Sequence, residues 1–106
     1  MENIDIKELG CIKAATRILG DKWTPKLLRD LANNGAMRFS TLQNNVEGIN
    51  PRTLSARLSY LEQEQIVSRT TYAEVPPRVE YALTQKGLDL WPILSQMSDW
   101  GARYYD

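Results

Sequence analysis

The sequence predicts a mainly helical α+β fold in a single domain, residues 1–106. Apolar residues recur at helical spacing through most of the chain. Residues 50–53 read Asn-Pro-Arg-Thr, an order that starts helices, because asparagine caps a first turn that tolerates proline. Two runs rich in β-branched and aromatic residues, 67–72 and 79–83, then flank a loop with two adjacent prolines. Short helices followed by such a hairpin predict a winged helix-turn-helix with a two-stranded wing.

Two helices are predicted ahead of this motif. Residues 9–19 form the first, with an apolar stripe at helical spacing. The second begins near Asp21 or Thr24, because either side chain can cap a helix and Pro25 suits a first turn. It ends at residues 33–35, Asn-Asn-Gly, which accept left-handed conformations. Its inner face consists of Trp23, Leu27, Leu28 and Leu31.

The helix-turn-helix itself is expected over residues 40–64. Ser40 should cap a third helix, after a short extended piece at 37–39. Asn50 should cap a fourth, which starts with Pro51 and lasts to Gln63 or Glu64. The apolar positions predicted for the core are Phe39, Leu42, Val46, Ile49, Leu54, Leu58, Leu61 and Ile66.

The wing is expected over residues 66–83, followed by a last helix. Residues 73–77 cannot be helical, and the diproline should hold them extended and stiff. Thr84 should cap the last helix, which reaches to about Tyr104. Pro92 lies inside this helix and should kink it or split it in two.

The two faces of the fourth helix differ in chemistry. With Leu54, Leu58 and Leu61 turned inward, the opposite face is short, polar and led by Arg52. Small side chains let a helix enter a groove, and an arginine can bind a guanine edge or a phosphate. Unpaired N–H groups of the first turn also favour a phosphate. The residues predicted to bind DNA are Ser40, Asn50, Pro51, Arg52, Thr53, Ser55, Ala56, Arg57, Ser59, Arg69 and Arg78.

Three of these arginines have alternative interpretations. Arg57 lies beside the buried stripe, so its stem can cover the core while it pairs locally with Glu62 or Glu47. Arg69 and Arg78 flank the hairpin loop, where they can meet phosphates or a minor groove, or simply charge an exposed strand edge. The sequence favours the phosphate role for Arg78 and leaves both roles open for Arg69.

The terminal segments, about 8–20 and 85–105, are predicted to form a two-fold homodimer. The last helix carries more apolar surface than so small a domain can bury, and we expect it both to pack along the first helix and to meet a second copy. Two reading helices would then lie about 34 Å apart, one turn of DNA. The alternative is a monomer with an unusually aromatic core. The predicted interface residues are Ile12, Trp91, Leu94, Met97, Trp100 and Tyr104.

Cys11 is the one cysteine of the chain. Its expected place at the start of a helix, with Lys7 and Lys13 nearby, favours a reactive thiolate and hence a redox-sensing role. The alternative is a small buried hydrophobic residue. A single cysteine allows an intersubunit or mixed disulfide but no intrachain one.

Composition excludes several function classes. The chain has no histidine, which removes His-based catalytic pairs and metal sites, and no glycine-rich phosphate loop or nucleophile motif is present. We therefore expect no enzyme activity, cofactor or metal. The absence of a signal peptide and of a long apolar run predicts a cytoplasmic protein without membrane contact. The net charge of zero argues against DNA and keeps open a winged-helix module that binds protein.

Motifs over nearly the whole chain resemble HxlR-type transcriptional regulators. The similar segments are Cys11, ILGDKWT (18–24), LLRDL (27–31), RFSTL (38–42), GINPRTLSARL (48–58), EVPPRVEYALT (74–84) and Trp100-Gly101. The resemblance implies a dimeric, bacterial-type DNA-binding regulator distantly related to MarR proteins, acting on a palindromic operator. It implies reading helices in successive major grooves and wings at the flanking backbone. Some relatives sense oxidants or electrophiles through the cysteine matching Cys11. The chain departs from many members in Ile12, where they carry proline, and in a less basic reading helix.

Overall fold

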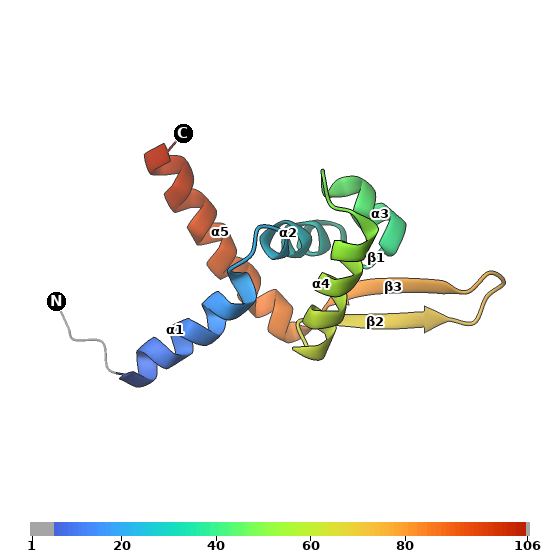
Figure 1. The fold of residues 1–106 in the computed structure, drawn as a ribbon, viewed down its shortest axis with the longest axis horizontal. Helices are drawn as coiled ribbons and strands as arrows, with labels where there is room; N and C mark the ends of the chain where they lie inside the picture. Colours follow the sequence, from blue (N-terminus) through green and yellow to red (C-terminus); the bar gives the residue numbers. More distant parts are fainter. Residues whose placement is uncertain (1–5, 106) are drawn as a thin grey trace.

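The computed structural model describes residues 6–105, with side chains from residue 11 onward. Over this range the chain forms five helices and a three-stranded sheet (Figure 1): α1 Ile6–Leu19, α2 Thr24–Asn34, β1 Met37–Arg38, α3 Phe39–Asn45, α4 Pro51–Gln63, β2 Val67–Tyr72, β3 Arg78–Leu83 and α5 Gln85–Tyr105. The β2–β3 wing projects from one end of the molecule, and α1 and α5 extend from the other (Figure 1). The predicted mainly helical α+β winged helix-turn-helix is confirmed.

Local capping signals predicted several boundaries correctly. The Asn50 side chain accepts a hydrogen bond from the Thr53 N–H at 2.8 Å, and α4 starts with Pro51. The Thr84 hydroxyl accepts from the Gly87 N–H at 3.2 Å and thereby caps α5. The same hydroxyl donates to the Gln65 carbonyl at 2.5 Å, which ties α5 to the turn before the wing.

The start of α3 differs from the prediction. Ser40 does not cap this helix but is its second residue, and Arg38 occupies the N-cap position without a capping bond from its side chain. The cause is β1, which leads directly into α3 and pairs with β3, placing Met37 opposite Tyr81 and Arg38 opposite Glu80. The sheet therefore has three strands in the order β1-β3-β2: the predicted two-stranded wing, β2 and β3, and β1 paired beside β3.

The predictions for the prolines are correct only in part. Of the two outcomes predicted for Pro92, the split is wrong, because α5 runs unbroken from Gln85 to Tyr105. Pro92 is exposed, so water can satisfy the carbonyl that its missing N–H leaves unpaired. The loop at 73–77 is not helical, as predicted, but it bends at Val75 and Pro76 around a cis peptide bond instead of staying extended.

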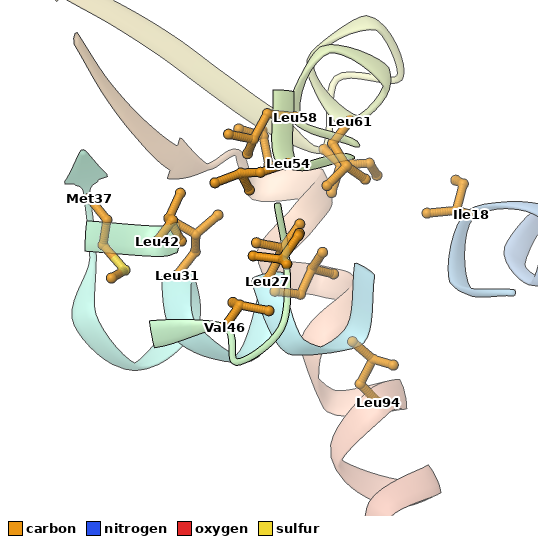
Figure 2. Packing of buried hydrophobic residues seen from close by; sticks show 14 residues of the cluster. Ile18, Leu27, Leu31, Met37, Leu42, Val46, Leu54, Leu58, Leu61 and Leu94 are labelled. Carbon is orange, nitrogen blue, oxygen red and sulfur yellow. The ribbon is translucent and has the colours of Figure 1, made fainter. Parts of the chain in front are cut away.

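Leucines of α2 and α4 form the centre of the core (Figure 2). The predicted inner positions of both helices are buried, and Phe39 and Trp23 pack at the margin of the same cluster. Burying a leucine side chain stabilises a fold by about 1.5–3 kcal/mol, so this contact fixes the orientation of α4. The fully buried leucines are Leu27, Leu28, Leu42, Leu54, Leu58 and Leu61.

The last helix does not pack along the first, contrary to the prediction. In the described part of the chain, α5 packs mainly against α2 and also contacts β3, whereas α1 contacts α2 and extends away from the core (Figure 1). The reason is Leu94, which turns into the core beside α2 (Figure 2) and draws α5 to that side. Both α1 and α5 therefore leave apolar side chains uncovered.

Asp21 joins the start of α2 to α4. Trp23 occupies the N-cap position of α2, but the Asp21 carboxylate accepts the N–H groups of Trp23 and Thr24, at 2.8 and 2.9 Å, and the Thr24 hydroxyl at 2.6 Å. Its second oxygen also accepts Arg57 Nη1 of α4 at 2.9 Å. Burial raises the pKa of Asp21, but the bonds from Thr24 and Trp23 and the charge of Arg57 outweigh it and hold that pKa below its ordinary value of 3.8.

This lowered pKa predicts a pH-dependent contribution to stability. A carboxyl with a lowered pKa in the folded state stabilises above its ordinary pKa of 3.8, and the effect is lost as the pH falls through the lower folded value. Asp21→Asn should reduce the free energy of unfolding by roughly 1–2 kcal/mol at pH 7. At pH 3 or below the difference from the unmutated protein should shrink.

Urea unfolding followed by circular dichroism at both pH values measures this difference. Asp89→Asn, at an exposed site on α5, serves as the control and should change stability little at either pH. An equal loss for Asp21→Asn at pH 7 and pH 3 would contradict the charged role of Asp21.

Candidate nucleic-acid interface

The outer face of α4 has the predicted polar surface. Leu54 and Leu58 point into the core, and the positions half a turn away are exposed. Thr53 is half-buried near the start of the helix. Apart from Arg52 and Gln63 the side chains on this face are short, so a groove could approach the helix backbone closely. The exposed positions are Arg52, Ser55, Ala56, Ser59 and Gln63.

The first turn of α4 offers fewer free donors than expected. Pro51 has no N–H, and the Thr53 N–H is taken by the Asn50 side chain. The Leu54 N–H bonds to the Asn50 carbonyl at 3.0 Å. Among the first three residues of α4, the Arg52 N–H is therefore the one for which the described structure records no partner. Any phosphate at this end would be bound mainly by the Arg52 side chain and this amide.

Arg57 is engaged within the protomer. Its guanidinium pairs with Asp21, and it lies 4.8 Å from the centre of the Tyr60 ring. The prediction that Arg57 pairs with Glu62 or Glu47 is wrong, because its partner Asp21 lies 36 positions away in the sequence. This contact supports the alternative in which Arg57 stabilises the fold, and it argues against the predicted DNA contact.

The two wing arginines have opposite surroundings. Arg78 lies between Glu74 and Glu80, with nitrogen–oxygen distances of 3.4 and 3.7 Å, and its guanidinium stacks 4.1 Å from the centre of the Tyr72 ring. Arg69 is exposed, and its guanidinium lies 3.4 Å from the Thr71 hydroxyl with no carboxylate paired to it among the described side chains. The geometry thus favours Arg69 for a phosphate contact, whereas the sequence favoured Arg78.

Two residues at the start of the helix-turn-helix face solvent. Ser40 is exposed in the first turn of α3, where its hydroxyl is available although it does not cap the helix. Arg38, directly before α3, is exposed as well. Arg38 is not among the predicted site residues, although its position next to the predicted third helix is a signal that could identify it.

The ends of the chain expose an apolar surface. Five side chains of α1 and α5 are between 49% and 63% exposed: Ile12, Ile93, Met97, Trp100 and Tyr104. The prediction that Leu94 belongs to the dimer interface is wrong, because Leu94 is 6% exposed and belongs to the protomer's own core. Trp91 is half-buried against that core. An open groove runs along α5 between Ile93 and Gly101.

Cys11 is exposed, which rules out the buried alternative. Because α1 begins at Ile6, Cys11 lies in the second turn and not at the helix start that the sequence suggested. The side chain of Lys7 lies outside the described residues. Among residues with described side chains, no three His, Cys, Asp or Glu groups gather as a metal site would require. No helix within the described range is both long and apolar enough to span a bilayer.

Comparisons with known proteins agree with this architecture. Residues 18–106 match the family model described as HxlR-like helix-turn-helix. An uncharacterized HTH-type transcriptional regulator of Methanothermobacter thermautotrophicus is 38% identical over 94% of this chain and 76% of its own length. The redox regulator HypR in its oxidized form is 36% identical, with a TM-score of 0.81 over 90% of this chain and 97% of its own. Reduced YodB from B. subtilis is 29% identical, with a TM-score of 0.82 over 98% and 97%. The chain therefore belongs to the HxlR-like helix-turn-helix family of transcriptional regulators.

Proposed function

We propose that this regulator binds a palindromic operator as a homodimer, with one α4 in each of two successive major grooves. The observation that carries the proposal is the division of α4 into a leucine face, buried against α2, and an exposed short polar face led by Arg52. The guanidinium of Arg52 has the donor geometry to bind a guanine edge, and the small side chains of Ala56 and Ser59 allow close approach to the bases. Specificity would therefore arise from α4.

The wing would supply backbone contacts. Arg69 is exposed on β2 and bears no carboxylate partner among the described side chains, so its charge is available to a phosphate. Arg78 is already compensated by Glu74 and Glu80. With few available cations and zero net charge, binding should involve few phosphates and depend on base contacts to a large extent.

A second copy of the chain is the partner that fits the uncovered ends of α1 and α5. The exposed stripe on α5 consists of Ile93, Met97, Trp100 and Tyr104 and has no charged member. Ile12 adds an apolar side chain on α1. Aromatic side chains continue the stripe, with the Trp100 and Tyr104 rings 5.6 Å apart. An apolar helix face of this kind is typical of a self-complementary two-fold interface. A two-fold axis at this end would separate the reading helices by about 34 Å and match a palindrome.

Oxidation of Cys11 is a second element of the proposal. Cys11 is exposed and neighbours Ile12 of the proposed interface. HypR is described as a redox regulator, and YodB is known in reduced and diamide-treated forms. A disulfide between the Cys11 thiols of two subunits, or with a small thiol, would change the interface and with it the spacing of the two α4 helices.

The first prediction from this proposal concerns the reading face. Arg52→Glu with Ala56→Glu should lower operator affinity by roughly 100-fold or more, because two carboxylates would face base edges and phosphates. The operator is first selected from a random DNA pool with the unmutated protein, and binding is then measured by fluorescence anisotropy at several salt concentrations.

The single changes Arg52→Glu and Arg103→Glu give a matched comparison, since both reverse one exposed arginine and Arg103 lies at the far end of α5. Only Arg52→Glu should weaken binding strongly. Undiminished binding by the double variant would refute the groove assignment. Failure to select any DNA, together with salt-insensitive capture of a protein, would favour the alternative protein-binding module.

The second prediction concerns the dimer. Met97→Glu with Trp100→Glu should halve the molar mass in solution, because burying two carboxylates in an apolar interface is unfavourable. Light scattering coupled to size exclusion measures the mass. Leu88→Glu is the matched control, since Leu88 is 46% exposed on the same helix but lies off the stripe. A single-chain mass for the unmutated protein would refute the dimer.

The third prediction concerns Cys11. Diamide oxidation should change the operator affinity of the unmutated protein by at least roughly fivefold, and dithiothreitol should reverse the change. The Cys11→Ser variant should have the operator affinity of the unmutated protein, and diamide should not change that affinity. A non-reducing gel distinguishes a disulfide between subunits from a mixed disulfide. The redox role is wrong if Cys11→Ser responds to diamide as the unmutated protein does, or if neither responds.

A further inference from the structure

A cavity of about 300 Å³ lies between α2 and α5. Its apolar walls come from Pro25 of α2 and from Trp91, Leu94 and Met97 of α5. Lys26 and Arg29 add two basic side chains from α2. Leu94 closes the base, since it is buried in the core where α5 crosses α2 (Figure 2). The cavity thus combines an apolar interior with cationic groups along one side.

The charges around this cavity are unbalanced. Lys26 and Arg29 are one helical turn apart on α2, and both are exposed. Arg29 Nε lies 3.7 Å from Asp30 Oδ1, which compensates that guanidinium in part. Lys26 Nζ lies 5.4 Å from the centre of the Trp23 ring and is paired with no carboxylate in the described structure. No lining residue is acidic, so the cavity favours an anion.

The volume and the lining of the cavity restrict the chemical class of ligand that it can bind. A volume near 300 Å³ is at the lower end of the range for small-molecule sites, which suits a molecule of one or two rings. Trp91 offers an aromatic surface to such rings, and Met97 is a flexible neighbour that adapts to their shape. We propose that this cavity binds a small aromatic anion, with the rings against Trp91 and Leu94 and the acidic group between Lys26 and Arg29.

A side chain from a second copy is the competing occupant. Met97 belongs both to this cavity and to the exposed stripe of α5, so a dimer partner would pass close to its mouth. An apolar side chain from that partner would fill the volume but leave Lys26 without a counter-charge and Arg29 compensated only in part by Asp30. Charge complementarity therefore favours the small anion.

The cavity lies between the two parts of the molecule that operator binding requires. On one side, α2 begins at Thr24, whose hydroxyl and amide bond to Asp21, and Asp21 binds Arg57 of α4. On the other, α5 carries the exposed stripe. A ligand that contacts both helices would couple the dimer interface to the reading helix. This regulatory consequence rests on the proposed function, whereas ligand binding itself does not.

The test uses two fluorescent probes that differ in charge. 8-Anilino-1-naphthalenesulfonate is an aromatic anion, and N-phenyl-1-naphthylamine has the same rings without the sulfonate. On the full chain, the anion should bind saturably with one molecule per subunit, more tightly than the neutral probe. Lys26→Gln with Arg29→Gln should lower the affinity for the anionic probe at least about tenfold, because a charge-assisted contact is lost. The same double change should leave the affinity for the neutral probe unchanged. Arg103→Gln, an exposed cation outside the cavity, should change neither.

Two further variants locate the probe. Ser98→Phe, at an exposed lining position, should fill the cavity and abolish binding of both probes while circular dichroism stays unchanged. Gln96→Phe, at an exposed position of the neighbouring groove, should preserve anion binding. Three results would overturn the proposal: equal affinity for both probes, insensitivity to the Lys26 and Arg29 changes, or loss with Gln96→Phe but not with Ser98→Phe. Probe fluorescence that rises only as light scattering shows dimers dissociating would assign the cavity to the second copy.

The probe-binding measurements need no DNA. They therefore test the ligand site even if no operator sequence is found. Once an operator is selected, its affinity with and without the anionic probe tests the regulatory consequence separately.

Discussion

The burial of one side of α4 against α2 is the contact on which the rest of the structure depends. Leu54, Leu58 and Leu61 are completely or almost completely buried, and they belong to the same core cluster as Leu27 and Leu28 of α2. Figure 2 shows the three α4 leucines on the side of the helix that faces Leu27. A helix that buries three leucines in a row at helical spacing has no freedom to rotate about its axis. The polar residues opposite are therefore held outward without any contact of their own. Packing beneath the helix, and not the surface residues, orients the proposed reading face.

Much of this fold was predictable because its signals are local. The Asn50 cap, the Pro51 start and the strand at 67–72 each depend on neighbours within a few positions, and each was predicted at the correct residue. The leucine face followed from periodicity alone. The polar face of α4 followed too, since a short straight helix turns its residues out as regularly as it turns others in.

Several of the errors concern pairings between distant residues. Nothing near Arg57 in the sequence distinguishes Asp21 from Glu62 or Glu47 as its partner, and only the crossing of α4 over the start of α2 selects Asp21. Leu94 was assigned to an interface because spacing cannot tell a protomer's core from a partner's surface. The pairing of β1 with β3 joins residues more than forty positions apart, and a strand of only two residues carries too little sequence signal to predict that pairing.

The same distinction between local and distant pairing bears on how a protein of zero net charge can be a DNA-binding regulator. Arg57 and Arg78 count as basic residues in the composition, but the fold neutralises both, one with Asp21 and the other with Glu74 and Glu80. What remains positive near the reading face is Arg52 itself, with Arg38 and Arg69 exposed on neighbouring elements. A protein with so few available cations holds non-specific DNA weakly, because the phosphate contribution to affinity is small. Discrimination then depends on contacts that only the right bases complete, so a low net charge favours selectivity over tight binding.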